Sequence, residues 1–219
     1  AGFFINNETD LDSFVSLNIN SLKRSDLLAY WDCPGQFDLF NDLDLDVQYT
    51  TLKSYEPFWT ANNWISTMKK KNICIVSPFI ETMKKQISSL NKIHANLDMQ
   101  KHNYSFVLAP QTNGSYKHSF DKPSWFQRLD IMKEKILKKE PDLVLIGAGS
   151  YGPPLGSILK DLGISSMVCG GALQLYFGIL GKRWEERDDY SKIFNDYWTR
   201  VSNDEIPDGH KLIEDGCYW

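Results

Sequence analysis

The stretch "LVLIGAGSYGPPLGSIL", residues 143–159, places a glycine-rich turn between an apolar run and a helical pattern. Residues 147–152 fit the pattern G-x-G-x-x-G, in which small residues let backbone N–H groups approach a phosphate. The apolar run at 143–146 lacks period-two alternation, which is typical of a strand covered on both faces. The stretch therefore predicts a buried parallel strand, a tight turn and a following helix.

The same alternation of strand and helix extends to both sides of this turn. Short β-rich runs occupy 72–77, 104–109, 142–147 and 165–170, and helical patterns lie between them at 80–95, 124–139 and 153–162. Strands that alternate with helices predict parallel strands joined by crossover helices. We therefore expect an α/β fold with a Rossmann-like, mostly parallel sheet and flanking helices.

The first 70 residues differ in composition, since they are rich in acidic and aromatic residues. The segments "LDSFVSL" (11–17), "SDLLAYW" (25–31) and "FDLFNDLDL" (37–45) show the three- and four-residue apolar spacing of helices. No internal repeat or low-complexity linker separates them from the remainder. We expect a single domain over 1–219, which comprises a helical N-terminal part (1–70), an α/β core (71–180), and a C-terminal helix with a tail (181–219).

Composition excludes several classes of protein. Of the 219 residues, 42% are apolar and 24% charged, a profile typical of a globular domain large enough to bury a core. The net charge of -4 argues against nucleic acid as the main partner. No apolar run approaches the roughly 20 residues that a membrane span needs.

Cysteine usage and the N-terminus bear on the compartment. The four cysteines are widely scattered and form no C-x-x-C pair, which disfavours a zinc site. The first residues lack the basic start and long apolar stretch of a signal peptide. We therefore expect reduced thiols and a cytoplasmic location. Because the sequence does not begin with Met, it could be part of a larger multi-domain chain.

A dinucleotide-binding fold requires more than the glycine turn. It also places an acidic residue at the end of the next strand, about 20 residues on, where the carboxylate bonds the ribose hydroxyls. Here the next strand ends at Cys169-Gly170-Gly171, and no acidic residue follows until Glu185. This absence disfavours an NAD enzyme. A tight strand-to-helix turn that binds nothing remains an alternative.

A second glycine cluster, "CGGALQLYFGILGKRW" (169–184), also follows a predicted strand. Two such turns after neighbouring parallel strands would meet at the carboxyl edge of the sheet, where open α/β sheets bind ligands. Lys182 and Arg183 lie just beyond and could offset phosphate charge, although a solvated basic pair is the alternative. We expect a phosphate-bearing ligand that is not a dinucleotide. The predicted nucleotide-binding residues are Gly147, Gly149, Ser150, Tyr151, Gly152, Gly170, Gly171, Gln174, Lys182, Arg183 and Trp184, the last as a stacking platform.

Five segments occur in an order that resembles a known family: "SPFIETMKKQ" (77–86), "LIGAGSYGPPLGSILKDLG" (145–163), "GGALQLYFGILGKRW" (170–184), "NDYW" (195–198) and "EDGCYW" (214–219). They resemble an incompletely characterised polysaccharide-biosynthesis family related to GT-D type glycosyltransferases, which have a Rossmann-like sheet. The chain is also similar to the central domain of multi-domain chlorovirus glycosyltransferases. The resemblance implies transfer of a sugar, with rhamnose as the narrower implication, from a UDP- or dTDP-linked donor to a glycan acceptor. A viral origin would place the protein in the host cytoplasm.

GT-D enzymes carry an Asp-x-Glu metal motif near the N-terminus, and the comparable segment here is "LKRSDLLAY" (22–30). Asp26 matches the final acid, but Arg24 stands where the first carboxylate belongs. The departure puts a tightly bound Mn²⁺ or Mg²⁺ in doubt, although either ion remains a candidate cofactor. Asp26 is left as a candidate catalytic base or weak ligand, and its alternative is an acidic helix N-terminus.

Two further acidic features complete the candidates. Asp42, Asp44 and Asp46 form overlapping D-x-D patterns, the metal signature of another glycosyltransferase class. We interpret the run as an exposed acidic edge, with a metal site as the alternative. Glu56, in "EPFW", is the second candidate for acid-base chemistry, and it also suits the start of a helix. The sequence therefore favours a glycosyltransferase. The alternatives are an NAD-dependent oxidoreductase or epimerase acting on sugar nucleotides, and a non-catalytic nucleotide-binding module.

Overall fold

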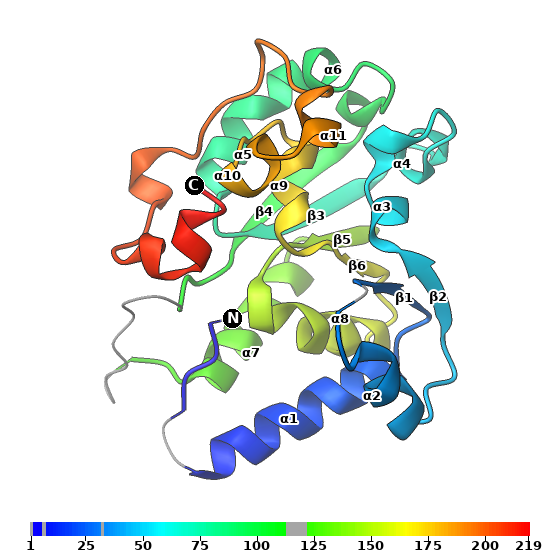
Figure 1. Ribbon diagram of the computed structural model, residues 1–219, viewed down its shortest axis with the longest axis vertical. Helices are drawn as coiled ribbons and strands as arrows, with labels where there is room; N and C mark the ends of the chain where they lie inside the picture. The colour runs from blue at the N-terminus through cyan, green and yellow to red at the C-terminus, as the bar shows by residue number, and fades with distance from the viewer. Residues whose placement is uncertain (1, 6–7, 32, 113–121) are drawn as a thin grey trace.

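The computed structural model describes residues 2–5, 8–31, 33–112 and 122–219. Four parallel strands form the central sheet in the order β4-β3-β5-β6, and helices cover both of its faces (Figure 1). The strands are β3 (Asn72–Ser77), β4 (Asn103–Leu108), β5 (Leu143–Ile146) and β6 (Ser166–Val168). This arrangement confirms the predicted α/β fold. The strand expected at 72–77 matches, and the other three differ only at their ends.

Side chains of the central strands alternate between two cores, although the sequence shows no polar alternation. Ile73 and Ile75 of β3 belong to one hydrophobic cluster, and Cys74 and Val76 to the other. All four are fully buried. Because successive residues of a strand point to opposite faces, an uninterrupted apolar run is what a sheet covered on both sides requires.

One face of the sheet is covered by α1 (Glu8–Lys23), α7 (Trp125–Leu137) and α8 (Gly152–Asp161), which lie below the sheet in Figure 1. A capping box starts α7, since the Ser124 hydroxyl accepts from the Gln127 backbone and the Gln127 side chain accepts from the Ser124 backbone. α7 and α8 realise the helices expected at 124–139 and 153–162.

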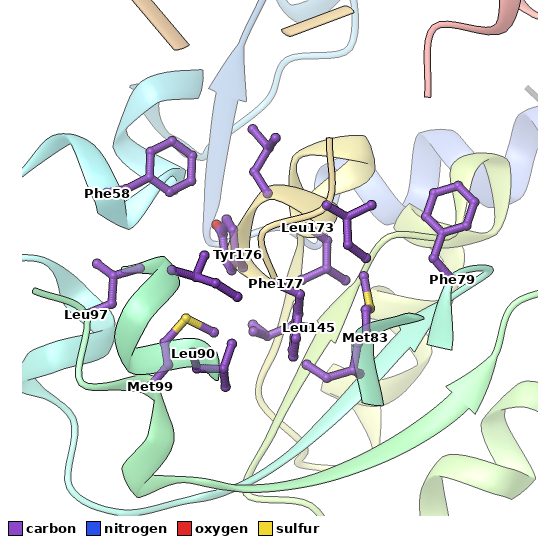
Figure 2. Close-up of a cluster of buried hydrophobic side chains, with 14 of the residues drawn as sticks. Phe58, Phe79, Met83, Leu90, Leu97, Met99, Leu145, Leu173, Tyr176 and Phe177 are labelled. Atoms are coloured by element: carbon purple, nitrogen blue, oxygen red, sulfur yellow. The ribbon is translucent and has the colours of Figure 1, made fainter. Parts of the chain in front are cut away.

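The opposite face is covered by α5 (Ile80–Gln86), α6 (Leu90–Ile93) and α9 (Leu173–Tyr176). The helix expected over 80–95 is therefore divided in two. Figure 2 shows the core on this side, where Met83, Leu145 and Phe177 converge from different elements. The tail contributes two short helices, α10 (Lys182–Glu185) and α11 (Asp188–Ser191), where we expected one.

The N-terminal part contains a second, two-stranded parallel sheet of β1 (Leu27–Tyr30) and β2 (Gln48–Thr51). The helical interpretation of 25–31 is therefore wrong. Leu28, Ala29 and Tyr30 are half-buried, and their backbone pairs with β2. An apolar run this short fits the periodicity of a helix as well as that of a strand, so the presence of a pairing strand decides which of the two forms. Besides α1, the α-helices described in this part are α2 (Gln36–Asp42), α3 (Leu52–Tyr55) and α4 (Trp64–Thr67).

Within the part of the chain that the structure describes, no helix combines the length and the apolar character that crossing a membrane demands.

Candidate functional site

The strand order creates a switch point between the carboxyl ends of β3 and β5. The chain leaves β3 toward β4 on one side and leaves β5 toward β6 on the other. Open α/β sheets bind ligands at this place. A cavity of about 1270 Å³ lies there, lined by the residues after each of these strands, by β1 and by the C-terminal tail. Its lining includes both candidate catalytic carboxylates and most of the predicted nucleotide-binding residues.

The two glycine turns are in contact at the cavity. A Cβ added to Gly147 would lie 2.8 Å from the carbonyl oxygen of Gly170, so no other residue fits there without movement. Gly149 has a φ of 53°, in the left-handed region that disfavours larger residues. Gly152 is not a lining residue, and a Cβ there would lie 2.7 Å from Val168, so its role is close packing of α8 on the sheet.

The side chains of Ser150 and Tyr151 contact the buried Trp125 of α7. The Trp125 indole donates a hydrogen bond of 3.1 Å to the Ser150 hydroxyl. The Tyr151 ring stacks on Trp125 with centroids 4.7 Å apart. Tyr151 borders the cavity and Ser150 does not. These two side chains therefore hold the turn in place from the α7 side.

Two helix N-termini near the cavity have few backbone donors left for an anion. The carboxylate of Glu205 accepts hydrogen bonds from the backbone N–H groups of Glu81 and Thr82, at 2.8 and 2.9 Å, so it caps the N-terminus of α5. The first turn of α8 contains Pro153 and Pro154, which lack backbone donors. A phosphate in this cavity must therefore rely on the glycine turns and on basic side chains.

Arg183 reaches the cavity wall and its neighbour Lys182 does not. The Arg183 guanidinium donates to the Tyr218 hydroxyl at 3.0 Å, forms an ion pair with Glu214, and lies 4.7 Å from the centroid of the Tyr218 ring. The Lys182 amine lies 3.9 Å from Glu186, on the surface. Of the predicted basic pair, the structure brings only Arg183 to the glycine turns.

Gln174 and Trp184 line the cavity but are almost wholly buried. The Gln174 amide donates to backbone carbonyls of Leu180 and Tyr218, at 3.2 and 3.3 Å, and its Oε1 has no partner among the described residues. Trp184 packs on Gly181, where an added Cβ would lie 2.9 Å from the indole. Gly171 is similarly tight, because an added Cβ would clash with the Tyr218 ring.

Asp26 and Glu56 line the same cavity in contrasting environments. The Asp26 side chain is 85% exposed and accepts from the Lys160 amine at 2.7 Å. The adjacent Arg24 forms an ion pair with Asp161 of α8. The Asp26 carboxylate thus belongs to an exposed ion-pair cluster between α8 and the N-terminal part. Asp26 does not start a helix, because β1 follows it.

Glu56 is 6% exposed and held by aromatic donors. The Tyr190 hydroxyl donates to the carboxylate, 2.8 and 2.7 Å from its two oxygens, and the Trp59 indole donates to Oε2. Burial raises the pKa of the Glu56 carboxyl, and the hydrogen bonds and the charges of Arg187 and Lys53 oppose that rise. A buried carboxyl with a raised pKa at a cavity is a candidate for proton transfer.

The acidic run that contained the D-x-D patterns lies apart from the cavity lining. Asp42 ends α2, Asp44 and Asp46 follow it, and all three are exposed. Across the described residues, no group of three or more His, Cys, Asp or Glu side chains is arranged to hold a metal ion.

Sequence reasoning missed several residues of the cavity wall. Trp31, directly after β1, lines the cavity and is 60% exposed. The centroid of its ring lies 5.8 Å from the Arg183 guanidinium. Arg187, Glu214 and Tyr218 come from the tail. The segment "EDGCYW" drew attention only through the family resemblance, and nothing in the local pattern places it beside Gly171.

Comparison with protein-family models, with curated proteins and with solved structures finds no match in any of the three.

Proposed function

We propose that the protein is a glycosyltransferase that moves a sugar from a nucleotide-diphosphate donor to a glycan acceptor. The observation that carries this proposal is the cavity at the switch point of the sheet, which brings together the two glycine turns, Arg183 and the buried Glu56. A volume of about 1270 Å³ exceeds the roughly 300–1,000 Å³ typical of a pocket for one small ligand. Donor and acceptor therefore have room together.

The donor diphosphate is assigned to the turns after β5 and β6. There Gly149 and Gly170, with φ values of 53° and 58°, leave the backbone at the cavity free of side chains, and Arg183 supplies positive charge. As the bond to the sugar breaks, negative charge develops on the leaving diphosphate, and a fixed guanidinium stabilises that charge. A UDP- or dTDP-linked sugar, with rhamnose as one candidate, meets these requirements.

Glu56 is the preferred base for the acceptor hydroxyl. Its burial and its two aromatic donors fix the carboxylate in one orientation, and its raised pKa increases its affinity for a proton. Asp26 is the weaker candidate because its carboxylate is solvated and paired with Lys160. In an inverting reaction, Glu56 would accept the acceptor's proton as that oxygen attacks the sugar carbon.

An NAD-dependent oxidoreductase or epimerase is less well supported. In dinucleotide folds the glycine turn follows the first strand, and an acidic residue ends the second. Here β3 is followed by Pro78 and Phe79, and β4 by Ala109, Pro110 and Gln111. Neither position offers the expected glycines or carboxylate.

The test is a two-stage assay on the whole chain. Thermal-shift measurements with UDP, dTDP, GDP, CMP, NAD and S-adenosylmethionine, each with and without Mn²⁺, identify the nucleotide. Release of nucleoside diphosphate from the matching sugar nucleotides is then followed with and without glycan acceptors. We expect stabilisation by UDP or dTDP and acceptor-dependent release. Stabilisation by NAD alone would favour the oxidoreductase, and tight binding without any turnover would favour a non-catalytic module.

A further inference from the structure

The ion pair between Arg183 and Glu214 lies at the wall of the cavity. The Arg183 side chain is 22% exposed and the Glu214 side chain 65%. Both residues line the cavity, and so does Tyr218. The Tyr218 hydroxyl accepts a hydrogen bond from Nη1 of Arg183, while Nη2 pairs with Glu214. A carboxylate from the tail thus occupies part of the donor fork that a phosphate would use.

The segment that carries Glu214 has an unfavourable backbone. Glu214, Asp215 and Gly216 have φ values of 46°, 52° and 76°, in the left-handed region, where residues other than glycine are rare. Such conformations persist only when surrounding contacts determine them. Here those contacts include the hydrogen bond from the Arg183 backbone to the Cys217 carbonyl, at 3.0 Å. Arg183 therefore holds the segment through its main chain as well as through its guanidinium.

We propose that Glu214 is a built-in competitor for the anion site of Arg183, and that it restricts this site to ligands bearing phosphate. A phosphate group carries about 1.5 to 2 negative charges and three acceptor oxygens, whereas a carboxylate carries one charge and two oxygens. Phosphate therefore displaces Glu214, and weaker monoanions do not. The exposed side chain of Glu214 can turn into solvent without leaving a buried charge unpaired. The inference rests on the proposed function only for the identity of the nucleotide.

A neighbouring ion pair supplies a matched control. Lys182 and Glu186, one turn apart on the chain, pair at 3.9 Å, and neither residue lines the cavity. The Glu186 side chain is 67% exposed, close to the 65% of Glu214. Glu186→Gln removes the same charge as Glu214→Gln, at a nearby point of the tail. An effect of Glu214 that came only from net charge would appear equally in both variants.

The experiment measures the affinity for inorganic pyrophosphate, UDP and uridine by calorimetry at constant low ionic strength. An exposed ion pair that must open before binding lowers apparent affinity by roughly two- to sixfold. Glu214→Gln should therefore tighten pyrophosphate and UDP by about that factor, and Glu214→Ala should act in the same direction. Uridine affinity should not change. Glu186→Gln should leave all three affinities unchanged, and in an Arg183→Ala background the Glu214→Gln effect should vanish.

The outcomes separate the inference from the proposed function. Unchanged or weakened pyrophosphate binding by both Glu214 variants would overturn the inference, since Glu214 would then be irrelevant or would position Arg183. Failure of every variant to bind pyrophosphate would overturn it as well. If the Glu214 variants bind pyrophosphate more tightly but UDP binds no more tightly than pyrophosphate, Glu214 is a competitor for the anion and the proposed site for this nucleotide is refuted.

Discussion

The sheet core and the N-terminal segment that faces it across the cavity are built differently. In the core, β3 and β5 are buried along nearly their whole length. In the N-terminal segment, defined here as residues 8–51, Phe40 is the only buried hydrophobic side chain among the described residues. Seven large hydrophobic side chains of that segment are exposed: Leu11, Val15, Leu27, Trp31, Phe37, Leu39 and Tyr49.

The difference shows which wall of the cavity can hold a reacting group firmly. The N-terminal segment joins the core through Phe14 and Leu17 of α1 and through ion pairs to α8. Glu56 instead follows this segment and is fixed by Tyr190 and Trp59, next to the core cluster. The two candidate bases therefore lie one on each side, with Glu56 on the firmer side.

The largest expected effect concerns these two carboxylates. Glu56→Gln keeps the size of the side chain but removes the base, so kcat for sugar transfer should fall by about 10²- to 10⁴-fold. Asp26→Asn should change kcat by less than about fivefold, because an exposed ion pair contributes little. Steady-state kinetics with a saturating donor measure both. A larger loss in Asp26→Asn would reverse the assignment of the base.

The pH dependence of the same reaction sharpens this comparison. Because burial raises the pKa of Glu56, its carboxylate protonates at a higher pH than an ordinary glutamate, and the base form is lost as pH falls. The acid limb of the kcat profile should therefore lie above the usual glutamate range. The same raised pKa means that folding stability from this group is present at low pH and declines as pH rises through the folded-state pKa. Glu56→Gln should abolish that decline in urea titrations, whereas an unchanged decline would assign it to another group.

Truncation of an apolar side chain should cost more unfolding free energy in the sheet core than in the N-terminal segment. Leu145→Ala leaves a cavity at a fully buried position of β5 and should cost about 2–5 kcal/mol of unfolding free energy. Leu11→Ala, at a half-exposed position of α1, should cost less than about 0.5 kcal/mol. Urea denaturation with linear extrapolation measures both changes. Equal losses would contradict the division into a packed core and a lightly packed segment.

A smaller effect is expected on UDP binding when Arg183 or Lys182 is replaced. Arg183→Ala should weaken UDP binding by about tenfold, or ~1.4 kcal/mol, because a cavity-lining guanidinium is lost while competition from Glu214 offsets part of the change. Lys182→Ala should leave UDP affinity unchanged, since its amine lies outside the cavity lining. Calorimetry with UDP and uridine checks both. Loss of uridine affinity as well would assign Arg183 to packing.

The smallest effect is expected for the ion pair that ties the N-terminal segment to α8. Arg24→Ala removes the pair with Asp161, whose side chains are about half exposed, and should cost about 0.2–1 kcal/mol. The difference from the parent should shrink in 0.5 M salt, because salt screens exposed charges. Lys84→Ala is the control, because it breaks a comparably exposed pair with Glu81 inside α5 that does not join two regions. A loss that persists in high salt would indicate packing by the arginine stem.

The sequence alone determined the core of this protein and the position of the glycine turns. The apolar runs around Ile75 and Leu145, separated by helical patterns, permit little else than parallel strands with crossover helices. Glycine clusters after two neighbouring strands meet at one edge because parallel strands share their direction. Those inferences depend on local periodicity and on chain direction, both of which are written in the sequence.

Only the tertiary structure decided the rest of the candidate site. Residues 27–30 form a strand because β2 pairs with them, and no local pattern identifies that partner. Glu56 became a buried carboxyl through Tyr190, 134 residues away along the chain. Arg183 meets Glu214 and Lys182 does not, because α10 presents only one of two adjacent basic side chains to the cavity. Contacts between residues so distant in sequence depend on packing, which sequence spacing does not encode.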